Sequence, residues 1–423
     1  MMRCSRLFPA MVIAAGAMPG LLAAQVAVPA DNARVRAALE TLKADNAWTL
    51  EQQVSICEIP APPFKEEQRA QEYRRRLEAL GLRNVRIDSV GNVIAERPGT
   101  GDGPSVVIAG HLDTVFPEET DVTVKREGTR FTGPGIGDDC RGLAVVLAVA
   151  RAFQKAGVQT RGPVYFVGNV GEEGPGNLRG MKHLFGSSLK DKVDYFISVD
   201  GTGFGTTSRA VGSNRYRITY KGPGGHSYGA FGIPNPIHAL GRAMAKIADL
   251  QVPSSPRTTF NVGVIEGGTS VNSIAFEASM EIDMRSESPD AVKAVDAQVM
   301  RIVREAMEEE NARWPGERAA RARVTVQIDT IGIRPANSAQ TESSPIVATA
   351  LAAARALGFT SDVSASSTDA NWPMSLGIPA ITIDGGGRGT GAHSLAESYD
   401  DGPNGWLGPQ WAALIVAALA GAR

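Results

Sequence analysis

The sequence has few cysteines, little net charge and, past its N-terminal segment, no long apolar run. Its three cysteines, Cys4, Cys57 and Cys140, exclude a scaffold held by many disulfides, although Cys57 and Cys140 could pair in an exported protein. The formal net charge of −2 gives no reason to expect nucleic acid or an anionic membrane as a partner. Because no later apolar run reaches the length of a bilayer span, we expect no membrane contact once the N-terminal segment is removed.

The N-terminal segment, residues 1–24, has the pattern of a secretory signal peptide. Arg3 and Arg6 precede an apolar run, and small residues before Ala24 offer a cleavage site. Cleavage after Ala24 removes both arginines and changes the net charge from −2 to −4. We therefore expect an exported protein, either periplasmic or secreted.

The remaining composition is typical of a folded globular protein. Hydrophobic residues make up 43% of the chain and charged residues 21%, and 423 residues suffice for two domains. The 47 glycines are many for this length and suit loops that turn sharply or approach a ligand.

Most of the chain predicts an α/β domain. Short apolar runs bounded by glycine and proline are typical of buried strands in a sheet covered on both faces. Apolar helices at 142–156 and 408–419 would cover that sheet, which predicts a three-layer catalytic domain with a central mixed, mostly parallel sheet. Residues 25–45 are expected to form a poorly packed extension. The predicted strands are 105–109, 164–167, 195–199 and 380–383.

The middle of the chain predicts a second, inserted unit. Residues 215–220, 275–283 and 323–328 alternate polar and apolar side chains, as half-exposed strands do. One helix follows Pro236, and another starts at Ser288, an N-cap residue with proline after it. The order β-α-β-β-α-β predicts a ferredoxin-like α+β lid or dimerisation domain. The predicted ranges are 1–24 for the signal peptide, 25–209 and 330–423 for the two parts of the catalytic domain, and 210–329 for the inserted domain.

Acidic residues and histidines follow the predicted strands of the α/β domain. His111 and Asp113, two residues apart, share one face of an extended segment, so that Asp113 can orient a metal-bound imidazole. Asp138 and Asp139 lie among glycines just before the first long helix. Taken singly, each residue has an ordinary structural explanation, such as a helix N-cap for either aspartate.

The later strand ends carry the same residue types. Glu172 and Glu173 follow the second strand, Asp200 follows the third, and His393 follows a glycine-rich loop after the fourth. In an open α/β sheet, ligands bind at the carboxyl ends of the strands. Carboxylates and imidazoles are zinc ligands, and one carboxylate can bridge two ions about 3.5–4 Å apart. The shared placement predicts a metal site.

These motifs resemble those of the di-zinc exopeptidase and amidase family that includes peptidase T, carboxypeptidase G, acetylornithine deacetylase and aminoacylase. The resemblance covers nearly all of the chain after residue 24, in motif order and domain layout. It implies that one zinc is bound by His111, Asp138 and Asp200, and the other by Asp138, Glu173 and His393. It further implies that Glu172 is the general base and that Asp113 supports His111.

The resemblance also assigns roles in the inserted domain. His226, in a glycine-rich turn, matches the histidine that stabilises the oxyanion, which is often supplied by the partner subunit of a homodimer. Asn272 and Arg285 match residues that grip the carbonyl or carboxylate of the substrate. Both have easy structural explanations as well, Asn272 in a turn and Arg285 beside an aspartate.

Two positions depart from the family pattern. Many relatives carry lysine two residues after the bridging aspartate, where this chain has Cys140, which we do not assign as a ligand. The acid at position 200 is aspartate rather than glutamate, which is closer to the peptidase T-like branch than to the deacetylases.

The sequence therefore predicts a zinc-dependent exopeptidase that acts on short peptides, in the manner of a di- or tripeptidase. Cobalt or manganese would suit the same ligands. The alternative that uses the same metal-dependent amide hydrolysis is an N-acyl amino acid deacylase of the same family. An exported solute-binding protein is the alternative from a different class, although it would need neither the adjacent glutamates nor the metal ligands.

Overall fold

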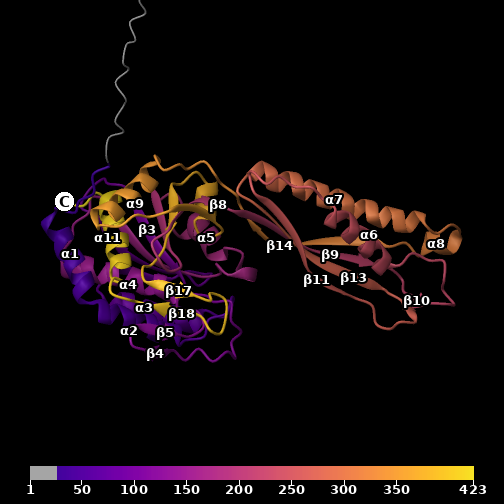
Figure 1. The fold of residues 1–423 in the computed structure, drawn as a ribbon, viewed down its shortest axis with the longest axis horizontal. Helices are drawn as coiled ribbons and strands as arrows, with labels where there is room; N and C mark the ends of the chain where they lie inside the picture. The colour runs from indigo at the N-terminus through magenta and orange to yellow at the C-terminus, as the bar shows by residue number, and fades with distance from the viewer. Residues whose placement is uncertain (1–25) are drawn as a thin grey trace, which may run out of the picture.

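The computed structural model describes residues 26–423, and the predicted signal peptide lies outside this part of the chain. An α/β domain and an elongated unit that extends from one side of it make up the described residues (Figure 1). No helix within residues 26–423 combines the length and apolarity that a bilayer span requires.

An eight-stranded mixed sheet forms the centre of the α/β domain. Its order is β1-β2-β6-β3-β7-β16-β8-β15, and the four inner strands run parallel. These four are the short apolar runs that the sequence predicts as buried strands. The strands are β1 (Arg83–Ile87), β2 (Val93–Arg97), β3 (Val106–His111), β6 (Val164–Asn169), β7 (Tyr195–Val199), β8 (Thr206–Ala210), β15 (Val363–Ser366) and β16 (Ala380–Ile383).

Helices cover both faces of this sheet. Successive side chains of each strand face opposite sides, so each inner strand contributes apolar side chains to a core on either face. In β3, Val106 and Ile108 belong to the larger core, whereas Val107 and Ala109 belong to the smaller core on the other face. The predicted three-layer α/β fold is confirmed. The larger core contains α1 (Ala33–Ala44), α2 (Asn46–Cys57), α3 (Glu67–Ala79), α4 (Cys140–Lys155), α9 (Pro345–Ala356) and α11 (Leu407–Leu419), and the smaller one α5 (Arg179–His183) and α10 (Asn371–Ser375).

Residues 25–45 do not form the poorly packed extension that the sequence predicts. Helix α1 buries Val35, Ala38 and Leu42 and packs on α4 and α11. The side chain of Asn32 caps this helix by accepting hydrogen bonds from two backbone N–H groups. The prediction was wrong because it overlooked the helical spacing of Val35, Ala38 and Leu42, which places these three apolar side chains on one face of the helix.

A small four-stranded sheet joins the two parts of the α/β domain. Strand β5 near the start of the domain pairs with β18 near its end, with Ser398 opposite Thr132. This pairing brings the loop after β5 close to the loop between β17 and β18, although the loops are distant in sequence. The strands are β4 (Lys125–Glu127), β5 (Arg130–Thr132), β17 (Arg388–Thr390) and β18 (Ser398–Asp400).

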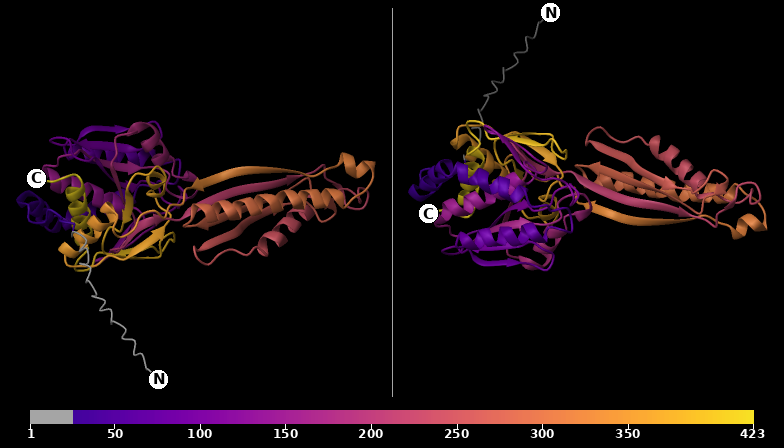
Figure 2. Two further views of the ribbon diagram at one scale, coloured as in Figure 1. Left: turned by 90° about the horizontal axis from the view of Figure 1, so that it is seen from above. Right: turned by 90° about the horizontal axis from the view of Figure 1, so that it is seen from below.

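The elongated unit has the predicted ferredoxin-like arrangement. Its antiparallel sheet has the order β11-β13-β9-β14, and helices α6 and α7 pack on one face of it (Figure 2). Strand β14 continues past residue 329, so the predicted limit of the inserted domain falls within a strand. The domain limits stay a prediction. The elements are β9 (Gly212–Lys221), β10 (Gly225–His226), α6 (Pro236–Ala248), β11 (Thr258–Gly267), β12 (Ser273–Ile274), β13 (Glu277–Ser286), α7 (Pro289–Ala312), α8 (Glu317–Arg321) and β14 (Thr325–Arg334).

Candidate metal centre

The five predicted metal ligands lie together at the carboxyl edge of the central sheet. His111 ends β3, Glu173 follows β6, and Asp200 follows β7. Asp138 comes from the loop that precedes α4, and His393 comes from the loop between β17 and β18. Strands far apart in sequence therefore deliver the ligand types to one place, as the sequence predicts.

Asp138 lies between the two histidines. Its Oδ1 atom is 3.0 Å from Nε2 of His111, and its Oδ2 atom is 3.1 Å from Nε2 of His393. His111 Nε2 is also 3.9 Å from Oδ1 of Asp200, and His393 Nε2 is 3.1 Å from Oε1 of Glu173. Two groups result, each with ligand atoms within 4.8 Å of one another, and Asp138 belongs to both.

The loop that carries Asp138 is held by Glu397, a buried residue that our sequence reasoning missed. The Glu397 carboxylate accepts hydrogen bonds from the backbone N–H groups of Gly135, Gly137 and Asp138, at 3.0, 2.8 and 2.9 Å. These bonds fix the backbone at the point where the Asp138 side chain leaves it. No local signal marks Glu397, because its role depends on the pairing of β5 with β18.

Asp139 has the structural role that is common for an aspartate before a helix. Its carboxylate caps α4 by accepting from the N–H of Gly142, and it also accepts from the N–H of His111, both at 2.9 Å. Gly142 lets the helix approach β7 closely, because a Cβ atom there would lie 2.0 Å from the carbonyl oxygen of Val199. Asp139 thus joins the start of α4 to the end of β3.

Asp113 supports the site in two ways. Its backbone carbonyl oxygen lies 3.0 Å from Nδ1 of His111 and must accept the proton of that nitrogen. Its carboxylate, 3.7 Å from the same nitrogen, instead accepts from the N–H groups of Glu172 and Glu173, at 3.1 and 2.7 Å. The predicted support of His111 therefore comes mainly from the backbone of Asp113, while its side chain orients the two glutamates.

The site concentrates negative charge. Burial and the charge of Asp138 raise the pKa values of Asp200 and Glu173, that of Glu173 to about 8. The hydrogen bond to Asp138 raises the pKa of His393 to about 9. For Asp138 itself, burial is outweighed by the hydrogen bonds from both histidines, which bring its pKa below the usual range. The carboxylates therefore demand positive charge between them.

The donor set fits divalent metal ions. Nδ1 of His111 is committed to a carbonyl oxygen, so its Nε2 lone pair can face a cation among Asp138 and Asp200. Imidazole and carboxylate are ligands that zinc accepts, and a carboxylate shared by two groups can bridge two ions. Cys57 and Cys140 are both free and buried, and neither belongs to these groups.

Comparison with known proteins gives the family. Residues 107–404 match the model of peptidase family M20/M25/M40. The chain belongs to this family. It is therefore a metal-dependent hydrolase of amide bonds, and the alternative of a solute-binding protein is wrong.

Its relatives in the M20/M25/M40 family include both peptidases and deacylases. YqjE, an uncharacterised protein of Bacillus subtilis, is 26% identical over 352 residues, which cover 79% of this chain and 89% of YqjE. N-acetylcysteine deacetylase of the same organism is 27% identical, over 58% of this chain and 67% of the enzyme. The crystal structure of a tripeptidase from Staphylococcus aureus has the same fold, with a TM-score of 0.71, 21% identity and coverage of 88% and 98%.

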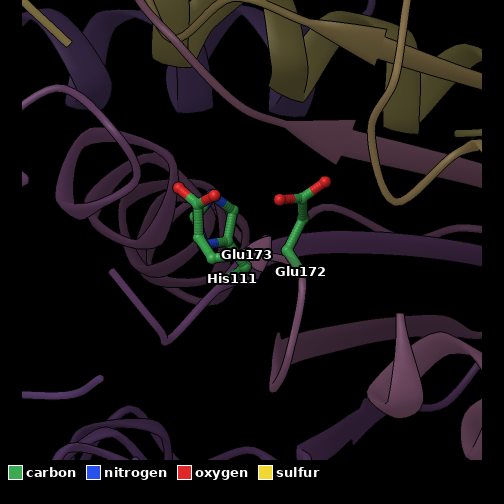
Figure 3. A group of neighbouring side chains, drawn as sticks. All are labelled: His111, Glu172 and Glu173. Atoms are coloured by element: carbon green, nitrogen blue, oxygen red, sulfur yellow. The ribbon is translucent and has the colours of Figure 1, made fainter. Parts of the chain in front are cut away.

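Glu172, the predicted general base, lies beside the ligands and points away from Glu173 (Figure 3). Arg334 donates from Nη1 to Oε1 of Glu172 at 2.7 Å, and from Nη2 to its backbone carbonyl. Within residues 26–423, Oε2 of Glu172 accepts no hydrogen bond. Glu172 also forms a third possible ligand group with His111 and Glu173, so its role as base or ligand stays a prediction.

The predicted lid residues divide between two places. Arg285 lines a cavity of about 480 Å³ together with Asp138, Glu172, Glu173 and His393. His226, on β10, does not line this cavity and lies toward the far end of the lid (Figure 1). Asn272 is beside it, since the N–H of Ser227 donates to the Asn272 carbonyl at 2.9 Å. Within the described chain, His226 and Asn272 do not reach the metal ligands.

The first prediction concerns Asp113. In the variant Asp113→Asn, an NH₂ group replaces one carboxylate oxygen, and it cannot accept a hydrogen bond. The backbone N–H of Glu172 or of Glu173 would then face another donor. We expect metal affinity to fall about tenfold to a hundredfold with an unchanged far-UV circular dichroism spectrum. Titration with Zn²⁺ against a competing chelator measures this loss. The control variant Asp121→Asn, which changes an exposed aspartate, should bind metal normally, and equal affinity in both variants would contradict the assignment.

The second prediction concerns pH. Because the pKa of His393 is raised to about 9 and that of Glu173 to about 8, both groups keep protons at neutral pH that a metal ion must displace. Metal affinity should therefore rise with pH up to about 9 and then level off. Calorimetry in buffers of different ionisation enthalpy should detect proton release at pH 7, and binding without proton release would refute this account.

Proposed function

We propose that the chain is an exported exopeptidase that hydrolyses short peptides with two zinc ions, in the manner of peptidase T-like di- and tripeptidases. The observation that carries this proposal is the position of Asp138, whose two carboxylate oxygens each face a different histidine. Aspartate at position 200 and the fold shared with the Staphylococcus aureus tripeptidase favour a peptidase. The N-terminal pattern of residues 1–24 supports export.

The metal ions would supply one part of the chemistry. Bound by His111, Asp138 and Asp200, and by Asp138, Glu173 and His393, they would polarise the scissile carbonyl group and lower the pKa of water toward neutrality. Zinc is the ion that these ligand types favour, and cobalt or manganese would also suit them.

Glu172 would move the proton in this mechanism. Arg334 engages only its Oε1 atom, so Oε2 is available to accept a proton from water and to pass it to the leaving nitrogen. The carboxylate of Asp113 fixes the backbone N–H of Glu172, and this bond holds the base at a constant position relative to Glu173. The amide bond would break as the nitrogen receives that proton.

His226 enters this mechanism only through a second copy of the chain. His226 lies too far along the lid to line the cavity of its own subunit. We therefore propose a homodimer in which His226 of one chain donates a hydrogen bond to the oxyanion at the site of the other. The mass of the active species in solution tests this proposal, because a fully active monomer would exclude the homodimer.

The alternative, an N-acyl amino acid deacylase, uses the same ligands with a different pocket, and the similarity to N-acetylcysteine deacetylase favours it. The purified, zinc-loaded protein should be assayed on a library of di- and tripeptides and on N-acetyl amino acids, with zinc content measured in parallel. We expect two zinc ions per chain and faster hydrolysis of the peptides. Faster hydrolysis of the N-acetyl compounds would select the deacylase.

Exchange of the two adjacent glutamates for glutamine separates their roles. Glu172→Gln should keep both metal ions and lose turnover by about 10²–10⁴-fold, because an amide cannot act as a base. Glu173→Gln should instead lose metal from one site. Elemental analysis and hydrolysis rates of both variants measure this difference. If Glu172→Gln loses metal while folded, Glu172 is a ligand and the two roles are exchanged.

A further inference from the structure

The cavity at the metal ligands is joined to a second cavity of about 320 Å³. Asp138 and Asp384 line both cavities, so these two residues lie where the cavities meet. Most of the second cavity is lined by glycines and small polar residues from loops that are distant in sequence. They include Gly137, Gly201, Thr202, Gly389 and Thr390.

The two domains give the first cavity walls of opposite charge. Arg215, Arg285 and Arg334 line it from strands of the lid sheet. The α/β domain contributes the metal ligands and Asp384. Within the described chain, no lysine or arginine lines the second cavity. The lid wall would therefore repel a positively charged group of a substrate, whereas the junction with the second cavity would attract it.

Asp384 has a carboxylate oxygen without a partner. Its Oδ2 atom accepts a hydrogen bond from the backbone N–H of Gly205 at 2.7 Å. Within residues 26–423, Oδ1 accepts no hydrogen bond, and no basic side chain forms an ion pair with this carboxylate. Burial raises the pKa of Asp384 to about 6, so the group is ionised at neutral pH in surroundings that disfavour its charge. A cation at Oδ1 would remove this cost.

The other carboxylates near the junction are already engaged. Asp138 faces two histidines, and Glu397 accepts from three backbone N–H groups. Glu172 in the first cavity is paired with Arg334. Asp384 is therefore the carboxylate at the junction that a ligand from outside the chain can use.

The loop after Asp200 fixes the orientation of the Asp384 carboxylate. A Cβ atom at Gly203 would lie 2.9 Å from Oδ2 of Asp384, and the backbone of Gly203 has a φ of +110°. Glycine meets both conditions, and it lets the loop pack against the carboxylate. The loop thus occupies the side of Oδ2 and leaves Oδ1 for a ligand in the cavity.

An ammonium group has the chemistry that this position requires. It donates three hydrogen bonds, of which one can go to Oδ1 of Asp384. The hydroxyl oxygens of Thr207 and Thr382, which line the same cavity, can accept others. In a peptide with a free N-terminus, a single carbon atom separates the α-ammonium group from the carbonyl carbon of the first residue. A peptide with this carbonyl group at the metal ligands would thus place its ammonium group near the junction.

We propose that Asp384 binds the α-ammonium group of the residue whose carbonyl group is attacked, so that the enzyme removes N-terminal residues from short peptides. Hydrolysis adds water across the first C–N bond. It releases the N-terminal residue as a free amino acid and leaves a new amino terminus on the remainder. This inference rests on the proposed peptidase activity and adds to it which end of the peptide is attacked.

The test compares alanyl-alanine with isobutyryl-alanine, in which a methyl group of similar size replaces the ammonium group. We measure kcat/KM of the zinc-loaded enzyme on both compounds. Alanyl-alanine should be preferred about tenfold or more, the effect of one charge-assisted hydrogen bond. If neither these compounds nor any other amide is hydrolysed, the proposed function itself fails. Equal hydrolysis of the two compounds overturns only this inference, and faster hydrolysis of isobutyryl-alanine overturns the peptidase as well.

The variant Asp384→Asn tests the assignment to one residue. Its amide oxygen can still accept from the N–H of Gly205, so the loop keeps its support while the charge is lost. We expect the ratio of kcat/KM for alanyl-alanine to that for isobutyryl-alanine to fall about tenfold, with an unchanged zinc content.

Asp362→Asn is the matched control, because Asp362 is an exposed aspartate of the same domain that lines neither cavity. This variant should keep the ratio of the unmodified enzyme. A purely structural role of Asp384 would lower the rates of Asp384→Asn on both compounds equally. An unchanged ratio in Asp384→Asn therefore refutes the proposal, even if the unmodified enzyme prefers alanyl-alanine.

Discussion

The site depends on one constraint: several carboxylates are held so close together that they need cations between them. Asp138 faces both histidines, and Asp200 and Glu173 lie on either side of it. In a buried place such an arrangement is costly unless positive charge compensates it. Burial and the charge of Asp138 raise the pKa of Glu173, and the hydrogen bond to Asp138 raises that of His393, so both groups hold protons that metal ions would displace. Metal binding and the raised pKa values of Glu173 and His393 thus have the same electrostatic origin.

The fold supplies the rigidity that this constraint requires. Parallel strands end at one edge, so His111 and Asp200 arrive on backbone that the sheet already fixes. The Asp138 loop has no such support of its own, and Glu397 provides it through three backbone hydrogen bonds. Glu397 itself is positioned by the pairing of β5 with β18. The metal centre is therefore coupled to the contact between the two parts of the α/β domain.

The lid adds a second, opposite electrostatic feature. The α/β domain contributes an acidic surface that attracts cations, and the lid sheet contributes arginines that attract anions. Arg334 connects the two, because it lies on β14 and contacts Glu172.

The sequence by itself determined the three-layer fold and the ferredoxin-like insertion, because both rest on local patterns, whereas the choice of the five candidate ligands among the acids and histidines came from the resemblance to a family. Apolar runs bounded by glycine mark the strands, and acids and histidines directly follow them. It did not predict the packing of α1 or the role of Glu397. Nor did it reveal Arg215 and Arg334 as cavity residues, or show that His226 lies away from the ligands of its own chain. These features arise from strand pairing between distant segments, and no pattern within a single segment records which strands will become neighbours.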